Sequence, residues 1–197
     1  MNLSSLLVLL TLPLPPVVDV KALPSVASIT GPFDQPTIDG QLDEPLWRAK
    51  TPVTKFLQDE PNEGAPVSER TEVVLAIDGG ALYVGARLFD SSPDLIKAQL
   101  ARRDDDVSSD QFMLYLDPHR DRLSGVYFGV NAAGTQYDGT LTNDDGRDSG
   151  WDAVWESAVV RDNLGWKVEM RIPLSQLRFD GAAKRAWGIN LERWIDR

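Results

Sequence analysis

The sequence predicts an all-β domain, a jelly-roll-like sandwich of two antiparallel sheets with one or two short helices. Three observations lead to this prediction. Hydrophobic residues alternate with polar ones in several short segments, as in strands that bury one face. Gly, Pro, Asn and Asp cluster between these segments and favour turns there. A helical pattern between strands occurs at 93–103, without the regular strand–helix alternation of a parallel sheet.

The chain begins with a segment typical of an export signal. Residues 6–14 form a short apolar core, and residues 25–27, Ser-Val-Ala, offer a cleavage site. No Lys or Arg precedes Lys21, which departs from the usual basic start, and a start codon assigned too far upstream is the alternative. We expect residues 1–27 to be a signal peptide and residues 28–197 to form an exported domain, in the periplasm, outer membrane or extracellular space.

The expected elements follow in order along the chain. A short helix is expected over 42–49, where Asp43-Glu44-Pro45 supplies an acidic first turn with proline, and a loop follows over 56–68. Turns at 78–80 and 162–165 each join two strands into a hairpin. The expected strands cover 73–77, 82–88, 112–116, 126–130, 154–160, 166–172 and 187–191.

One face of these strands supplies the expected core, because neighbours along a strand point to opposite faces. The residues expected to face this shared core are Val73, Leu75, Ile77, Leu82, Val84, Leu114, Phe128, Val168 and Trp187. Trp166 is expected to lie in the same core. The alternation still continues when the sequence stops, so we expect the domain to be truncated at its C-terminal end.

Composition limits the classes of function. The formal net charge of −10 repels nucleic-acid phosphates and anionic lipid, so no nucleic-acid partner is expected, whereas neutral sugars and calcium are compatible. The absence of Cys excludes disulfides, thiol catalysis and Cys-ligated zinc. His119 is the one histidine, so a Ser-His-Asp triad would have to use it.

Three phrases carry a family resemblance. They are IDGQLDEPLW at 38–47, WDAVWE at 151–156 and GWKVEMRIP at 165–173. Together they resemble carbohydrate-binding module family 9, in the version found at the N-terminus of large bacterial cell-envelope proteins with an uncharacterised C-terminal region. The resemblance implies binding of oligo- or polysaccharide, with a downstream domain of the same polypeptide as a further partner.

Four residues are candidates for the sugar site. A sugar site needs flat aromatic faces and planar hydrogen-bonding side chains, which favours Trp151 and Trp155 beside the polar segment 142–148. Packing in the sandwich is the alternative for both tryptophans. Asp110 and Asn131 complete the candidate set, and hydrogen bonding at strand ends is their alternative role.

The same resemblance places the family's strongest binding positions on unsuitable residues. Asp110 matches an Asp of the sugar-binding members, but the Trp three residues before it falls at Val107. The Glu of those members falls at Met113 and the Arg at Gly129, while the second Trp would lie beyond the last residue. The fold therefore matches better than the binding site does.

The leading functional prediction is a non-catalytic sugar-binding module that supports polysaccharide breakdown by a larger protein. Two alternatives remain: an adaptor domain of the outer envelope that has lost sugar binding, and the non-catalytic part of an O-glycosyl hydrolase. No isolated pair of carboxylates stands out for glycoside hydrolysis. Glu156 and Glu169 lie on opposite strands of one expected hairpin, but the family resemblance implies structural partners for them, such as Arg171 or Arg193. Any hydrolase activity would then lie in a downstream region.

Acidic loops raise the question of a structural calcium ion. Asn143, Asp144, Asp145 and Asp148 offer several oxygen ligands, and Gly146 lets the loop turn them inward. The triplet 104–106 is a weaker candidate, and solvated loops are the alternative for both clusters. Neither haem nor a nucleotide is expected, since Met113 and His119 form the one available Met–His couple for haem and His119 lies in a surface turn.

Overall fold

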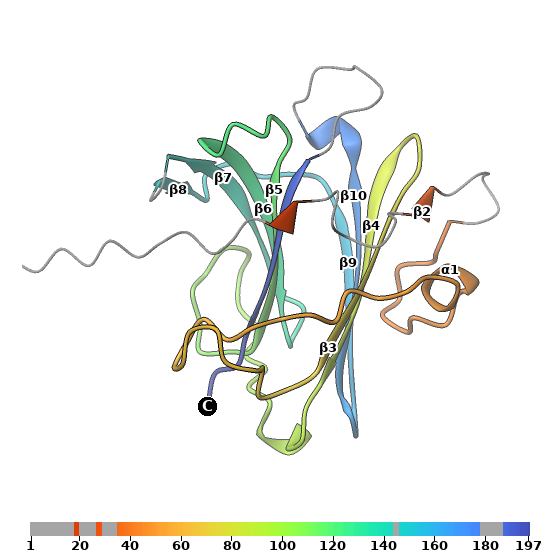
Figure 1. The fold of residues 1–197 in the computed structure, drawn as a ribbon, viewed down its shortest axis with the longest axis vertical. Helices are drawn as coiled ribbons and strands as arrows, with labels where there is room; N and C mark the ends of the chain where they lie inside the picture. The colour runs from red at the N-terminus through yellow and green to blue at the C-terminus, as the bar shows by residue number, and fades with distance from the viewer. Residues whose placement is uncertain (1–17, 20–26, 29–34, 144–145, 178–186) are drawn as a thin grey trace, which may run out of the picture.

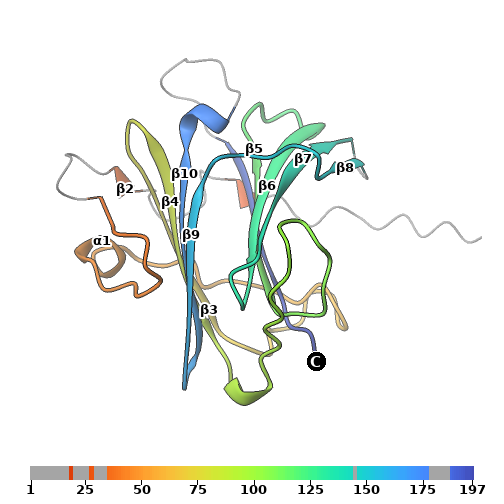
Figure 2. The same cartoon turned by 180° about the vertical axis from the view of Figure 1, so that it is seen from behind.

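The computed structural model describes residues 18–19, 27–28, 35–143, 146–177 and 187–197. Two β-sheets face each other and enclose a hydrophobic core (Figure 1). The view from behind shows the same two layers, with the short helix α1 on the outer side of the smaller sheet (Figure 2). The predicted two-sheet β-sandwich is confirmed.

The larger sheet has the strand order β1-β11-β5-β6-β7-β8, and neighbouring strands run antiparallel. Its strands are β1 (Val18–Asp19), β5 (Gln111–Asp117), β6 (Ser124–Asn131), β7 (Gln136–Thr142), β8 (Gly146–Asp148) and β11 (Gly188–Trp194).

The smaller sheet has the order β2-β3-β4-β10-β9. Its strands are β2 (Ala27–Ser28), β3 (Thr71–Ile77), β4 (Ala81–Phe89), β9 (Glu156–Asp162) and β10 (Gly165–Pro173). The pair β2–β3 is parallel, and the other pairs are antiparallel. The short helices are α1 (Pro45–Arg48), η2 (Pro93–Leu95) and η3 (Leu174–Gln176).

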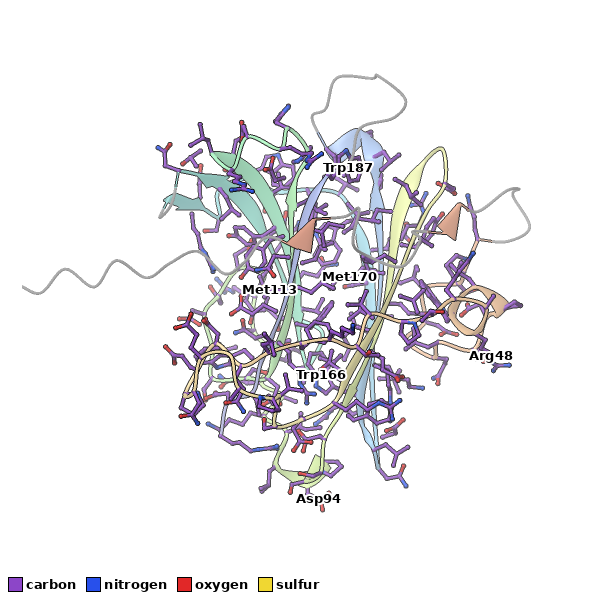
Figure 3. The ribbon with its side chains drawn as sticks, in the orientation of Figure 1. Arg48, Asp94, Met113, Trp166, Met170 and Trp187 are labelled. Atoms are coloured by element: carbon purple, nitrogen blue, oxygen red, sulfur yellow. The ribbon has the colours of Figure 1, made fainter. Side chains whose placement is uncertain are left out.

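The core forms between the inward faces of the two sheets. Val73, Leu82, Phe128 and Trp166 are buried there, and Figure 3 shows Trp166 and Met170 between the sheets. Trp187 packs against this cluster at its margin. The expected core is thus confirmed except at Ile77, which is half-buried and lies outside the cluster.

The structure corrects the expected helix over 93–103. Only Pro93–Leu95 is helical, and the following loop runs along the β6–β7 turn. The backbone N–H of Ala101 donates to the Thr135 hydroxyl at 3.0 Å, and that of Asp104 donates to the Gln136 carbonyl at 3.1 Å. These bonds satisfy backbone groups that a helix would satisfy internally.

The sequence-based prediction lacked the two-residue strands β1 and β2 and also β7 and β8. β7 contains Asp138 and Gly139, residue types that are depleted in strands. β8 has three exposed residues and no apolar one. The expected helix over 42–49 is present in a shorter form, as α1.

Most of the predicted signal peptide lies outside the described residues. The two-residue strands β1 and β2 lie within this segment and at its end, and they pair with β11 and β3. Cleavage near Ala27 stays a prediction. Among the described residues, no helix has the length and hydropathy to cross a membrane.

Candidate functional site

Trp151 and Trp155 lie on the core side of the larger sheet. Both rings meet the Phe128 ring edge-on, with centroid distances of 6.0 Å for Trp151 and 5.4 Å for Trp155. Trp155 is only 7% exposed, and Trp151 is half-buried against the core. This geometry favours packing for Trp155, because a sugar would need an open ring face.

Asp110 and Asn131 are both buried and hold loops in place. The Asn131 side chain donates to the Gln99 carbonyl at 2.7 Å and accepts from the Ala133 and Thr135 N–H groups at 2.9 Å. Asp110 accepts from the N–H groups of Lys97 and Asp196. Burial raises the pKa of Asp110. These bonds fit the strand-end role that the sequence left open.

The described calcium candidates lie at the β7–β8 hairpin. Asn143 lies in the turn, Asp144 and Asp145 lie outside the described residues, and Asp148 ends β8. The Asp148 carboxylate accepts from the N–H of Gly150 at 2.8 Å. Within the described parts of the chain, no group of three acidic or histidine side chains is placed to hold a metal.

Structural calcium therefore stays a prediction with a simple test. If the hairpin turn binds calcium, millimolar calcium should raise the melting temperature more than sodium chloride of equal ionic strength, because binding to the folded state alone stabilises it. Differential scanning calorimetry with and without a chelator measures this. Equal melting temperatures in the two salts would identify the turn as a solvated loop.

The other acids singled out by the sequence have structural partners. Arg171 donates to Glu156 at 2.8 Å, as expected. Glu169 is bound instead by N–H donors, and Arg193 pairs with Asp90. These contacts give no support to a catalytic pair of carboxylates among the residues named.

The outer face of the larger sheet carries a second set of aromatic side chains. Tyr115, Tyr127 and Tyr137, with Met113 and Leu141, form a cluster on β5, β6 and β7 that we call the outer tyrosine patch. The rings of Tyr115 and Tyr127 are 6.4 Å apart and tilted by 47°.

Glycines on the neighbouring strands make room for this patch. A Cβ atom at Gly129 would overlap the Met113 side chain, and one at Gly139 would overlap the Tyr127 ring. Gly in a strand commonly marks such a close approach. Met113 and Gly129 are cross-strand partners. The resemblance implies Glu at position 113 and Arg at position 129, but here the Met113 thioether fills the space at both positions.

Charged side chains border the patch. The Tyr115 hydroxyl donates to a Glu192 oxygen at 2.6 Å and accepts from an Arg147 N–H at 3.1 Å. The Arg147 guanidinium lies 5.5 Å from the Tyr115 ring centroid and 5.8 Å from that of Tyr127, within cation–π range. Burial and the Glu192 charge raise the pKa of Tyr115, so its hydroxyl keeps the proton that it donates.

Trp194 extends this outer face along β11. Glu192 pairs in register with Met113, which lies on the outer face, so Glu192 points outward as well. Trp194 pairs with Gln111 and lies two residues further along β11, so it points to the same face. Trp194 is 49% exposed. The sequence-based candidate set omitted Trp194. The alternation along residues 191–194 nevertheless indicates that Trp194 shares a strand face with Glu192.

Solved structures with the same fold include carbohydrate-binding modules. A family 9 module from Caldicellulosiruptor kristjanssonii in complex with cellotriose has a TM-score of 0.56 and 20% identity, over 84% of this chain and 73% of that one. The corresponding complex with glucose gives a TM-score of 0.55 and 21% identity, over 80% and 72%.

A candidate carbohydrate-binding protein from Bacteroides uniformis is also similar in structure. Its TM-score is 0.62 at 13% identity, and the match covers 87% of this chain and 83% of that one. No family model and no curated protein matches the chain. The similarity shows a shared fold, which confirms the expected resemblance to family 9 modules at the level of the fold.

Proposed function

We propose that this domain binds carbohydrate on the outer face of the larger sheet, with Trp194 as the stacking surface. The observation that carries the proposal is the exposed Trp194, next to Glu192 and Gln111 on an antiparallel sheet. Two structures that share this fold hold cellotriose and glucose.

The chemistry of this face suits a sugar. An aromatic ring offers a flat apolar surface to the C–H groups of a pyranose, and its neighbours supply hydrogen bonds to hydroxyl groups. Trp194 and Glu192 are two residues apart on one strand, which separates them by about 7 Å. A single sugar ring can therefore contact both side chains.

The wider role follows from the family resemblance and is part of the proposal. The domain would act after export, as one part of a larger envelope protein that engages oligo- or polysaccharide during its breakdown. An adaptor domain without sugar binding remains the second candidate. The observation that favours the adaptor is Met113, an apolar side chain that fills the space beside Gly129.

Replacing Trp194 with Ala tests the binding proposal. We expect affinity for a cello-oligosaccharide to fall by about 1–3 kcal/mol, the range for a lost large aromatic contact, with little change in melting temperature. Isothermal titration calorimetry measures the affinity. Trp155→Ala is the matched control, because loss of this buried ring should lower stability by about 3–5 kcal/mol without a direct effect on the site.

The outcomes separate the two candidate functions. If the intact domain binds none of a broad panel of glycans, the adaptor function is favoured. If it binds with equal affinity after Trp194→Ala, the domain binds sugar elsewhere, and half-buried Trp151 is the next residue to replace.

A further inference from the structure

We propose that Glu192, Tyr115 and Arg147 form a polar triad that binds two adjacent hydroxyl groups of an uncharged sugar. The inference rests on the proposed function and names the residues and ligand class of that site. The three residues come from β11, β5 and β8, strands that are far apart in the sequence and joined by one sheet.

The triad has hydrogen-bonding capacity left on both sides of Tyr115. Tyr115 uses its one proton for Glu192 Oε2, and no described residue donates to the second Glu192 oxygen. A guanidinium carries five N–H donors, and Tyr115 takes one of them from Arg147. The triad therefore presents an acceptor on its Glu192 side and donors on its Arg147 side.

Both ends of the triad can be reached from solvent. Arg147 is exposed, and Glu192 is half-buried on a strand whose next outward residue is the exposed Trp194. Trp194, Glu192, Tyr115 and Arg147 thus follow one another across the outer face. A sugar stacked on Trp194 would have its hydroxyl groups directed along this line.

Charge determines which sugars fit. A hydroxyl group can donate to Glu192 and its neighbour can accept from Arg147, so an uncharged diol uses both ends of the triad. A carboxylate could accept from Arg147 but could give Glu192 no proton. We therefore expect uronate-containing glycans to bind more weakly.

The position of Arg147 allows a competing role. Its guanidinium covers the ring faces of Tyr115 and Tyr127, where a sugar could also stack. If Arg147 acted as a cap on these rings, its removal would strengthen binding, whereas a ligand-binding Arg147 predicts weaker binding. The direction of the change distinguishes the two roles.

The test compares single variants by calorimetry, with a neutral cello-oligosaccharide and an oligogalacturonate as probes. Arg147→Ala and Glu192→Gln should each weaken binding of the neutral probe on the order of tenfold, the effect of losing one charged hydrogen bond. Tyr115→Phe should weaken binding of the neutral probe less, because it removes only the hydroxyl that links the two charged side chains and leaves both of them in place. Arg161→Ala, an exposed arginine on the other sheet, is the matched control and should leave affinity unchanged.

Each outcome bears on one proposal. Tighter binding after Arg147→Ala, or preferred binding of oligogalacturonate by the native chain, overturns the triad. Unchanged affinity in Arg147→Ala and Glu192→Gln also overturns it, while the proposed function survives if Trp194→Ala still weakens binding. A native chain that binds no glycan overturns both. Melting temperatures close to that of the native chain show that each variant is folded.

Discussion

Asp90→Ala should lower the free energy of unfolding by about 3–5 kcal/mol, the cost of breaking a buried ion pair. Asp90 is fully buried between the sheets and lies beside Arg193, whose side chain is only 6% exposed. The Arg193 guanidinium also donates to the Phe89 carbonyl at 2.7 Å. Without Asp90, the Arg193 charge would stay in the interior without its carboxylate.

Two companion variants show whether the buried charge is the cause. Arg197→Ala removes a more exposed partner of Asp90, so it should cost only about 1 kcal/mol. Combining Asp90→Ala with Arg193→Met should restore most of the lost stability, since hydrophobic residues can replace a buried ion pair. Urea denaturation measures all three variants. If Asp90→Ala costs no more than Arg197→Ala, the buried-charge argument is wrong.

The strands with clear alternation could be predicted from sequence because burial on one face leaves a period of two. Val73, Leu82 and Phe128 were placed correctly for this reason. β7 was missed because its inward position 138 holds a buried Asp, which binds the Ala153 N–H and pairs with Arg103. Such a residue has the sequence pattern of a loop, and only its partners, distant in the sequence, explain its burial.

The candidate site was harder to propose from sequence than the fold. Trp151 and Trp155 were chosen for their neighbours in sequence, yet their rings pack on Phe128. The triad depends on strand order, because Arg147 reaches Tyr115 from β8, across the larger sheet. A sequence period shows which residues point outward, but it does not show which strands are neighbours.

Glu169→Ala should lower the free energy of unfolding by about 1–3 kcal/mol, because it removes the carboxylate that accepts from three N–H donors and leaves the buried Gly40 N–H without an acceptor. The Glu169 side chain is fully buried and accepts from the backbone N–H groups of Asp39 and Gly40 at 2.9 and 2.6 Å. It also accepts from the Trp47 indole at 2.7 Å. A buried donor without an acceptor costs about 1–3 kcal/mol. Gly40 would be left in this state, whereas Trp47 keeps a second acceptor in Glu44 and Asp39 keeps one in the Thr37 carbonyl at 3.1 Å.

The loss should be local as well as global. Glu169 lies on β10 and fixes the segment before α1 to the outer side of the smaller sheet. Glu169→Ala should therefore accelerate hydrogen exchange of the Asp39 and Gly40 amides, relative to the native chain, by a larger factor than it accelerates exchange in the core strand β4. Equal acceleration throughout the domain would instead show that the segment unfolds together with the sandwich.

The ionisation of Glu169 should also make stability depend on pH. Burial raises the pKa of Glu169, and the N–H donors of Gly40 and Asp39 offset this only in part. The folded carboxyl therefore keeps its proton to a higher pH than the unfolded one, whose pKa is about 4.3. Its contribution to the free energy of unfolding is complete below that pH and is lost as pH rises through the folded pKa.

Glu169→Gln isolates this contribution because an amide does not titrate. We expect the native chain to lose stability relative to Glu169→Gln as pH rises from about 4 to 7, while other acids titrate alike in both proteins. Urea denaturation of both proteins over this range measures the difference. If the stability of the native chain relative to Glu169→Gln does not change with pH, the N–H donors offset the effect of burial on the Glu169 pKa completely. If the native chain gains stability relative to Glu169→Gln as pH rises, the N–H donors outweigh burial. The decline we expect follows if burial is the stronger effect, as the position of Glu169 under α1 indicates.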